Sequence, residues 1–269
     1  MIIFAASLKG LRDANEDKHT VILNTDNKGK GTVPISFFGV YDGHGGKFVS
    51  EFLSKNLPKY FVNAESANFP FSRKYIYNVF SNIQNTLKAE YRQEARQCGS
   101  TCLSMLHYSI DNQNYVNLIN VGDSRAILCR DNLAIPLTKD HKPFWPEEKR
   151  RIEEAGGSVY YDGSDYRIKD LSVSRAVGDI DAEPYVISKP EVYKYKIEKN
   201  DKFIVLGCDG LYDYLSNQDI VNFILNEYYD ETLSNKINKK MNIAKKLGEY
   251  AIHNGSTDNI TVIIVFFNA

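Results

Sequence analysis

The chain has 269 residues, of which 43% are hydrophobic, so it can bury a large core in one domain or in two small ones. Its formal net charge of −1 gives no electrostatic reason to expect a nucleic acid or an acidic membrane as the main partner. No apolar run reaches the roughly 18 residues of a membrane span, and the first residues lack the basic start of a signal peptide. We therefore expect a single domain over residues 1–269, with no nucleic-acid or membrane partner.

The predicted strands are short apolar runs bounded by turn residues. In chain order they cover residues 1–6, 20–23, 35–41, 101–108, 115–121, 125–129, 202–208 and 260–267. Residues 24–31 are rich in turn formers and are predicted to be an exposed connection. The short turn Gly122-Asp123-Ser124 predicts that the strands on either side of it pair as an antiparallel hairpin.

The predicted helices have apolar residues at helical spacing or a proline in front and glycines behind. They lie between residues 49 and 57, 76 and 87, 146 and 155, 217 and 229, and 234 and 253. Residues 158–190 are predicted to be an irregular, exposed loop region beside the functional site. Because the helices come in groups rather than one after each strand, we expect an α+β fold with an antiparallel sheet core covered by helices.

Acidic residues fall at the ends of several predicted strands. Asp42 and Asp209 each end a strand, Asp258 immediately precedes the last one, and Glu16 and Asp17 precede an early one. In an antiparallel sheet the end of one strand and the start of its neighbour lie at the same edge. We therefore expect these carboxylates to converge at one sheet edge.

Converging carboxylates repel one another, and each costs several kcal/mol to desolvate unless cations lie between them. Oxygen ligands without a cysteine or histidine cluster select Mg²⁺ or Mn²⁺. Two such ions about 4 Å apart can activate a water and hold a phosphoryl group. Gly43 and Gly210 beside the aspartates would let the backbone approach an ion closely. A lone Asp-Gly pair is better interpreted as a turn, but the distant acids together favour a metal site.

Eight segments, in order, resemble the catalytic domain of the protein phosphatase 2C family, the metal-dependent serine/threonine protein phosphatases. They are Arg12-x-x-x-Glu16-Asp17, Val40-Tyr-Asp-Gly-His-Gly-Gly46, Cys98-Gly-Ser-Thr101, Val121-Gly-Asp-Ser-Arg125, Asp140-His-Lys-Pro143, Ser172-Val-Ser-Arg-Ala-Val-Gly-Asp179, Cys208-Asp-Gly-Leu-Tyr-Asp213 and Gly255-Ser-Thr-Asp-Asn-Ile-Thr261. The resemblance covers residues 3–266. It implies a four-layer α-β-β-α sandwich of two antiparallel sheets flanked by helices. It also implies an enzyme that hydrolyses phosphoserine and phosphothreonine in phosphoproteins.

The resemblance also implies how two Mg²⁺ or Mn²⁺ ions are held. Asp42 would bridge both ions, Asp209 and Asp258 would complete one coordination shell, and Glu16 and the Gly43 carbonyl would contribute to the other. Water would complete much of each shell, as Mg²⁺ prefers.

Groups around the ions take their implied roles from the same family. Asp17 would orient metal-bound water by hydrogen bonds. Asp123 and Asp213 resemble residues that, with Asp209, hold a weaker third ion in some members. Arg12 would hold the phosphate with its planar donor fork.

Two of these residues, Arg12 and His44, also have an alternative interpretation as purely structural residues. Arg12 would otherwise form a surface ion pair with Asp13 or Glu16. His44, which the resemblance makes the acid that protonates the leaving oxygen, would otherwise only hydrogen-bond within its own turn. His141, Ser174 and Arg175 match the family too and are interpreted as structural, as residues 236–246 are interpreted as a solvated basic helix face.

The chain departs from the family pattern at two places. Lys169 and Asp170 stand where members generally carry small residues, which bears on loop shape and substrate preference. Tyr212 stands where tryptophan is common.

Competing functions are excluded by what each would need. A cysteine-based phosphatase needs an arginine six residues after its cysteine, and none of Cys98, Cys102, Cys129 and Cys208 has one. A phosphatase with histidine ligands would need more histidines than the five present. A nuclease would share the acids but lacks a basic surface signal, and a silent phosphatase that only binds would usually have lost a metal ligand.

The cysteines also bear on location. They show no C-x-x-C spacing, which argues against a zinc ribbon and is typical of the reducing cytosol or nucleus. We therefore expect structural thiols and a cytoplasmic or nuclear protein, and we favour a monomer.

Overall fold

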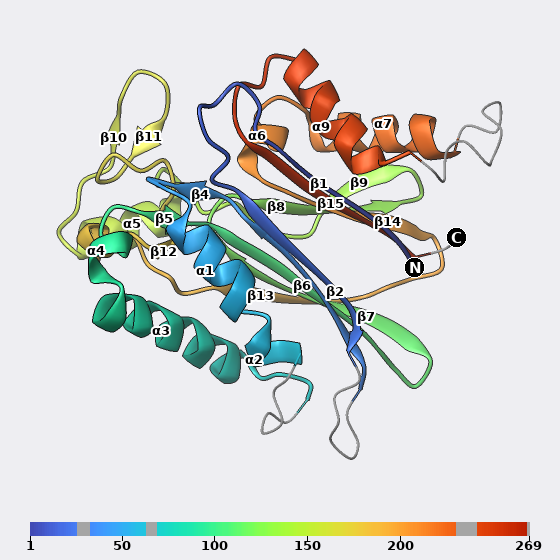
Figure 1. The fold of residues 1–269 in the computed structure, drawn as a ribbon, viewed down its shortest axis with the longest axis horizontal. Helices are drawn as coiled ribbons and strands as arrows, with labels where there is room; N and C mark the ends of the chain where they lie inside the picture. Colours follow the sequence, from blue (N-terminus) through green and yellow to red (C-terminus); the bar gives the residue numbers. More distant parts are fainter. Residues whose placement is uncertain (26–32, 63–68, 230–240, 268–269) are drawn as a thin grey trace.

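A computed structural model describes residues 1–25, 33–62, 69–229 and 241–267, and its core is two five-stranded antiparallel sheets packed face to face (Figure 1). The first sheet has the strand order β1 (Ile2–Leu8), β15 (Ile260–Phe266), β14 (Asp201–Gly207), β8 (Arg125–Arg130) and β9 (Leu133–Pro136). The second sheet has the order β13 (Glu191–Lys196), β7 (Gln113–Val121), β6 (Cys102–Ile110), β3 (Ile35–Tyr41) and β2 (Lys18–Thr25).

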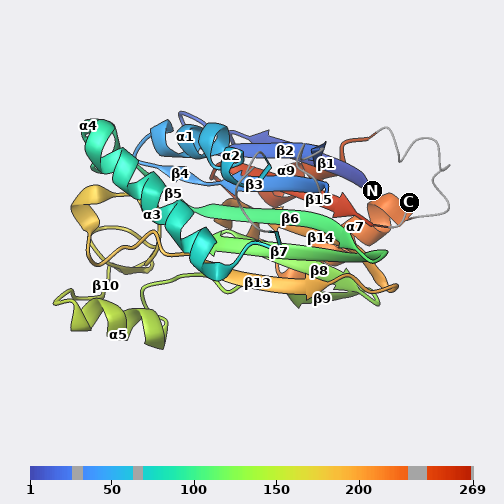
Figure 2. The ribbon, with the colours of Figure 1, turned by 90° about the horizontal axis from the view of Figure 1, so that it is seen from below.

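Helices cover the outer faces of both sheets, as Figures 1 and 2 show. The second sheet is covered by α1 (Phe48–Asn56), α2 (Lys59–Val62), α3 (Arg73–Glu90) and α4 (Arg92–Ala95). The first sheet is covered by α6 (Asp209–Tyr212), α7 (Asn217–Tyr229) and α9 (Ile243–His253). The α+β class and the four-layer sandwich that the sequence predicts are confirmed. None of the helices in the described ranges is long and apolar enough to cross a membrane.

Strands β3, β14 and β15 are buried on both faces, which explains their continuous apolar runs. In β3, Phe37 and Tyr41 pack against the helices, whereas Phe38 and Val40 pack against the first sheet. Successive side chains of a strand point to opposite faces, so one run serves two core layers. Each fully buried large side chain stabilises the fold by roughly 1.5–3 kcal/mol.

The hairpin predicted around Gly122-Asp123-Ser124 is wrong. Strand β7 pairs with β6 and β13 in the second sheet, whereas β8 pairs with β14 and β9 in the first. The turn therefore carries the chain from one sheet to the other. Gly122 has a φ of +104°, a conformation that glycine adopts readily and that lets the chain change direction at this point.

The segment 158–190 is not an exposed loop throughout, so that prediction is also wrong in part. It contains β10 (Tyr160–Tyr161), β11 (Tyr166–Arg167), β12 (Val177–Gly178) and a 3-10 turn, η1 (Ile180–Ala182). Five of its buried apolar side chains pack with Ile152 of α5 (Pro146–Glu154): Ile168, Val173, Ala176, Ala182 and Val186. These residues follow neither strand nor helix spacing, so the sequence pattern does not reveal their burial. Tyr160 and Tyr161 are exposed, as expected.

A third, three-stranded sheet joins distant parts of the chain. Its order is β12, β5 (Gly99–Ser100) and β4 (Gly43–His44), and Figures 1 and 2 place it at the end of the sandwich that also holds α5 and β10. Two predictions lie partly outside the described residues: the connection at 24–31, from residue 26 on, and the start of the last helix and its basic stretch, up to residue 240.

Candidate metal centre

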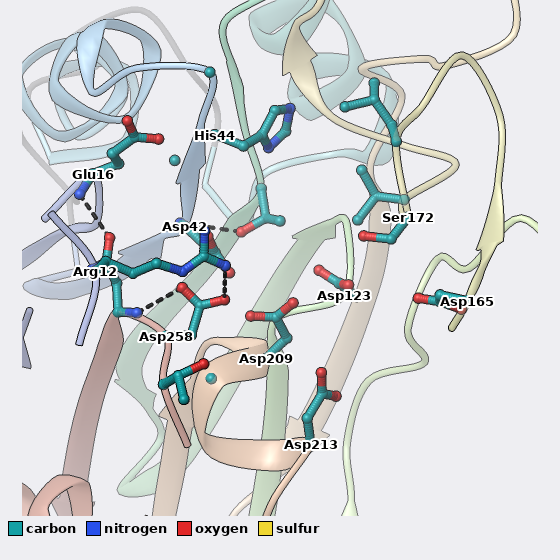
Figure 3. Close-up of a pocket in the computed structure, with 18 of the residues that line it drawn as sticks. Arg12, Glu16, Asp42, His44, Asp123, Asp165, Ser172, Asp209, Asp213 and Asp258 are labelled. Carbon is teal, nitrogen blue, oxygen red and sulfur yellow. Dashed lines mark hydrogen bonds and ion pairs between the residues drawn. The ribbon is translucent and has the colours of Figure 1, made fainter. Parts of the chain in front are cut away.

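A cavity of about 930 Å³ opens at one end of the sandwich and gathers the predicted site residues (Figure 3). All of them but Asp17 line it: Arg12, Glu16, Asp42, Gly43, His44, Asp123, Asp209, Asp213 and Asp258. Residues of the loop region, among them Asp165, Arg167 and Ser172, form part of the wall.

The acids reach this cavity from both sheets, so the expectation of a single sheet edge is corrected. Asp42 follows β3 of the second sheet, whereas Asp209 follows β14 and Asp258 precedes β15, which are neighbours in the first. Asp123 lies on the crossover between the sheets. The two sheets stack so that these strand ends lie at the same end of the sandwich. The carboxylates therefore meet there.

Asp42 and Asp209 are at the centre of the cluster. One ligand atom each from Asp42, Asp209 and Cys208 lie within 4.8 Å of one another. Burial raises the pKa of Asp42 well above its ordinary range, and the charge of Asp209 raises it further. Burial likewise raises the pKa of Asp209 to about 8, with the charge of Asp123 adding to the effect. Two half-buried carboxylates that disfavour each other's charge in this way fit a cation between them.

Asp17 does not line the cavity and is almost fully buried. Neither of its carboxylate oxygens receives a hydrogen bond from the part of the chain that the structure describes. Burial raises its pKa to about 6. Burying a carboxylate that accepts no hydrogen bond costs free energy. Water molecules bound to a cation would supply the missing hydrogen-bond donors, so Asp17 also fits a metal site.

The Cys208 thiol is not suited to a hard ion and is already engaged by the protein. Its sulfur accepts a hydrogen bond from the Thr261 amide at 3.1 Å and donates to the Asn259 carbonyl at 3.4 Å. All four cysteines are free and buried, as expected for structural thiols. The donors that remain are oxygens, which fit Mg²⁺ or Mn²⁺.

The glycines beside the aspartates are needed for packing between chain segments. A Cβ on Gly43 would lie 2.5 Å from the Glu16 carbonyl oxygen and 2.8 Å from the Ser50 hydroxyl. A Cβ on Gly210 would collide with the Asn259 carbonyl oxygen. Both glycines therefore let two distant segments meet behind the carboxylates.

Arg12 makes neither of the surface pairs considered as alternatives. Its Nη2 donates to Asp258 Oδ2 at 2.6 Å, while its side chain remains 60% exposed (Figure 3). The loop that carries Arg12 is tied to the last strand by Asn259, whose side chain donates to the Lys9 and Ala14 carbonyls and accepts from the Glu16 amide. Nothing in the sequence pattern around Asn259 predicts this role.

Lys142 is a second residue that the sequence analysis missed. Its Nζ donates to Asp123 Oδ2 at 2.5 Å, and its side chain is 14% exposed. Burial lowers the pKa of Lys142, but Asp123 raises it by more, so the side chain is a cation. This ammonium neutralises part of the charge at the place where the resemblance implies a third ion. Asp213, the other implied ligand there, lies at the exposed rim.

His44 has a partner far away in the sequence rather than within its own turn. Its Nε2 lies 2.7 Å from Oδ2 of Asp179, a buried residue outside the predicted set. Burial lowers the pKa of His44, but Asp179 raises it by more, and the net shift is upward. The imidazole is therefore a cation more readily than an ordinary histidine.

The residues interpreted as structural do support the walls of the cavity. His141 Nδ1 accepts from the Gly122 amide, and the Arg175 guanidinium contacts the buried carboxylate of Glu148 on α5. Tyr212 is buried with the Arg125 guanidinium 4.7 Å from its ring centroid, so the tyrosine keeps an aromatic platform where tryptophan is common.

Comparisons with known proteins agree with this geometry. The family model described as protein phosphatase 2C matches residues 3–260. A PP2C-like domain-containing protein of Acanthamoeba polyphaga mimivirus is 44% identical over 169 residues, which cover 57% of this chain and 94% of that protein. A probable protein phosphatase 2C of Arabidopsis thaliana is 36% identical over 263 residues, 97% of this chain and 65% of that protein. The solved structure of a C. elegans sex determining protein matches 98% of this chain and 64% of that one, with a TM-score of 0.85 and 27% identity. The chain thus spans slightly less than two thirds of the last two.

Proposed function

Because this chain belongs to the protein phosphatase 2C family, we propose that it is a metal-dependent phosphatase that hydrolyses phosphoserine and phosphothreonine in proteins. The observation that carries the proposal is the meeting of Asp42 and Asp209, half-buried and mutually repelling, in the lining of a 930 Å³ cavity. Such a pair keeps a proton at neutral pH unless a cation lies beside it, and a bound cation lets both carboxylates ionise.

Asp42, Asp209, Asp258, Glu16 and the Gly43 carbonyl all line the cavity and would hold two Mg²⁺ or Mn²⁺ ions, with Asp42 contributing to both. When bound, two such ions supply a nucleophile from water and neutralise the charge of the phosphate. Asp17, whose two carboxylate oxygens receive no hydrogen bond from the described residues, would orient water at the site.

Arg12 and His44 act on the substrate itself. The exposed Arg12 guanidinium exchanges Asp258 for the phosphate oxygens, which it matches with two parallel hydrogen bonds. Water attacks phosphorus as the bond to the seryl or threonyl oxygen breaks, and a proton from the His44 imidazole passes to that oxygen. The attacking water gives up a proton to solvent, and His44 takes one back from solvent, so each turnover converts the phosphoester and one water into the free hydroxyl and phosphate.

A third ion at Asp123 and Asp213 would have to displace Lys142 from Asp123, so we propose a centre with two resident ions. Phosphoproteins are the proposed substrates. The cytoplasm or nucleus remains the predicted location, and a monomer the predicted state.

The two competing functions make different demands on the same pocket. A nuclease would need free cations along the path of a polynucleotide, whereas Arg12, Lys142 and Arg167 in the wall of this cavity are each paired with an aspartate. A silent phosphatase would lack a ligand, whereas Glu16, Asp42, Asp209 and Asp258 all line the pocket.

The test is phosphate release from a phosphothreonine peptide with Mn²⁺, with Mg²⁺ and after chelation by EDTA. We expect release that needs the metal, disappears with EDTA, and is lost in Asp42→Asn. Release that survives full chelation would contradict the proposal, as would cleavage of single-stranded DNA without any release from the peptide.

A further inference from the structure

We propose that Asp179 is a positioning residue for His44, fixing the imidazole so that Nδ1, and not Nε2, delivers the proton to the leaving oxygen. This inference rests on the proposed function, because it assigns the atom through which His44 works and the group that selects it.

The geometry leaves one ring nitrogen for the substrate. Nε2 of His44 lies 2.7 Å from Asp179 Oδ2, which is a full hydrogen bond. Nδ1 makes no hydrogen bond within the described residues. In Figure 3 one ring nitrogen faces the carboxylates and the other points away from them. Because Asp179 holds Nε2, the nitrogen that faces the pocket is Nδ1.

The small third sheet brings the two side chains together. His44 in β4 pairs with Gly99 in β5, and Gly99 pairs with Gly178 in β12, directly before Asp179. The side chains of His44 and Asp179 then meet across Gly99. A Cβ on Gly99 would collide with Asp179 Oδ2 and lie 2.6 Å from His44 Nε2, so only glycine leaves room for the pair.

The backbone around Asp179 is fixed from two sides. Its amide donates to the Cys98 carbonyl at 3.1 Å, and its φ of 45° lies in the left-handed region. Buried Gln84 of α3 donates to the Gly178 carbonyl at 2.8 Å and accepts from the Gly178 amide at 2.9 Å. Gln84 therefore holds the residue before Asp179, and the Cys98 carbonyl holds the Asp179 amide, so the backbone that carries the carboxylate is fixed.

Asp179 is also almost fully buried, with 3% of its side chain exposed, whereas 27% of the His44 side chain is exposed. A buried carboxylate whose partner reaches into a cavity resembles the way orienting carboxylates select the working nitrogen of a histidine. Seryl and threonyl oxygens are poor leaving groups and need the proton, whereas p-nitrophenolate leaves readily without one.

The test compares Asp179→Asn with wild type on a phosphothreonine peptide and on p-nitrophenyl phosphate, both with Mn²⁺. Asparagine has the same shape and tolerates the left-handed backbone. We expect kcat on the peptide to fall by about tenfold or more, with kcat on p-nitrophenyl phosphate within about twofold of wild type. Asp181→Asn is the matched control, because Asp181 pairs with Arg96 at the surface and should change neither rate.

A second comparison uses the His44→Gln background, in which adding Asp179→Asn should cause no further loss on the peptide. Equal losses on both substrates, an unchanged peptide rate, or a full additional loss in the His44→Gln background would overturn the inference. If Asp179→Asn does not fold, Gly99→Ala should give the same split between substrates, and an equal loss on both would overturn it. A wild type inactive on both substrates would instead contradict the proposed function, which separates the two failures.

Discussion

At the scale of single residues, the cavity concentrates negative charge that the protein does not fully neutralise. Burial raises the pKa of Asp209 to about 8, so in the metal-free protein this group binds a proton more tightly when folded than when unfolded. The free energy of unfolding therefore falls as the pH rises from about 4 to about 8. A cation bound to Asp209 reverses this loss, so stability and metal binding are linked at this residue.

We predict that Asp209→Asn has opposite effects with and without metal. In EDTA at pH 8 it should raise the free energy of unfolding by about 1–3 kcal/mol, because it removes a buried and repelled charge. At pH 5 the gain should be smaller, since wild-type Asp209 is then largely protonated.

With Mn²⁺ the same variant should lose both the metal-induced rise in Tm and the phosphatase activity. Thermal unfolding at the two pH values, with and without Mn²⁺, measures all of these effects. An Asp209→Asn protein that is stabilised by Mn²⁺ as strongly as wild type would show that Asp209 is not a ligand.

At the scale of elements, the wall of the cavity contains a turn with unusual residues. Ile168 and Leu171 exchange two backbone hydrogen bonds of 3.0 Å, and Lys169 and Asp170 between them have φ values of +52° and +67°. A turn with two positive φ values favours Asn-Gly, and lysine is costly there. Lys169 and Asp170, which stand where family members generally carry small residues, therefore strain the backbone of the loop beside the pocket.

We predict that Lys169→Asn raises the free energy of unfolding by about 0.5–1 kcal/mol, because asparagine adopts the left-handed conformation more readily. Lys169→Val should lower it by about 1 kcal/mol or more, since a branched side chain is disfavoured there. Both variants lose the weak contact of Lys169 with the Tyr185 ring, so their difference isolates the backbone. Equal stabilities in urea unfolding would contradict this account.

The buried carboxylate of Glu148 on α5 contacts Arg175 in the segment 158–190. Glu148 receives hydrogen bonds from Arg175 and Arg151. Burial opposes its ionisation, but the two guanidinium groups lower its pKa to about 2, well below the ordinary 4.5. Its ionised form therefore stabilises the fold above pH 4.5, and this contribution is lost as the pH falls towards 2.

We predict that Glu148→Gln destabilises the protein by about 3–5 kcal/mol at pH 7, because two arginines lose their buried counter-charge. The difference from wild type should shrink as the pH is lowered from 4.5 towards 2. Urea unfolding across this range measures it. The control is Glu153→Gln, which removes only the exposed pair with Lys149 and should change stability by less than about 1 kcal/mol. A pH-independent difference for Glu148→Gln would contradict the assignment.

At the scale of the whole molecule, the sequence predicts the layers better than the connections. The family resemblance is confirmed, and the main strands and the helices at 48–56, 73–90, 146–154 and 217–229 lie close to their predicted bounds. Long apolar runs and helical spacing are local signals, and tertiary packing reinforces them here. Strand β13, Glu191–Lys196, was missed although its side chains alternate, because Tyr and Lys make a weak apolar signal at a sheet edge.

What the sequence does not predict depends on contacts between distant segments. A short turn does not tell whether the strands on either side of it share a sheet, so the sequence predicts a hairpin at Gly122 where the chain crosses between sheets. The partners Asp179, Lys142 and Asn259 are ordinary polar residues in their own segments. Their roles become visible only in the folded chain, where Asp179 contacts His44, Lys142 contacts Asp123 and Asn259 contacts the Glu16 amide.

The central claim is that the carboxylates at the end of the sandwich hold two cations on either side of Asp42. Anomalous diffraction from a crystal soaked in Mn²⁺ tests it most directly. We predict two peaks about 4 Å apart, both in contact with Asp42, one also with Asp209 and Asp258 and the other also with Glu16. A soaked crystal with no Mn²⁺ peak at Asp42, or with Mn²⁺ bound only elsewhere, would contradict the account.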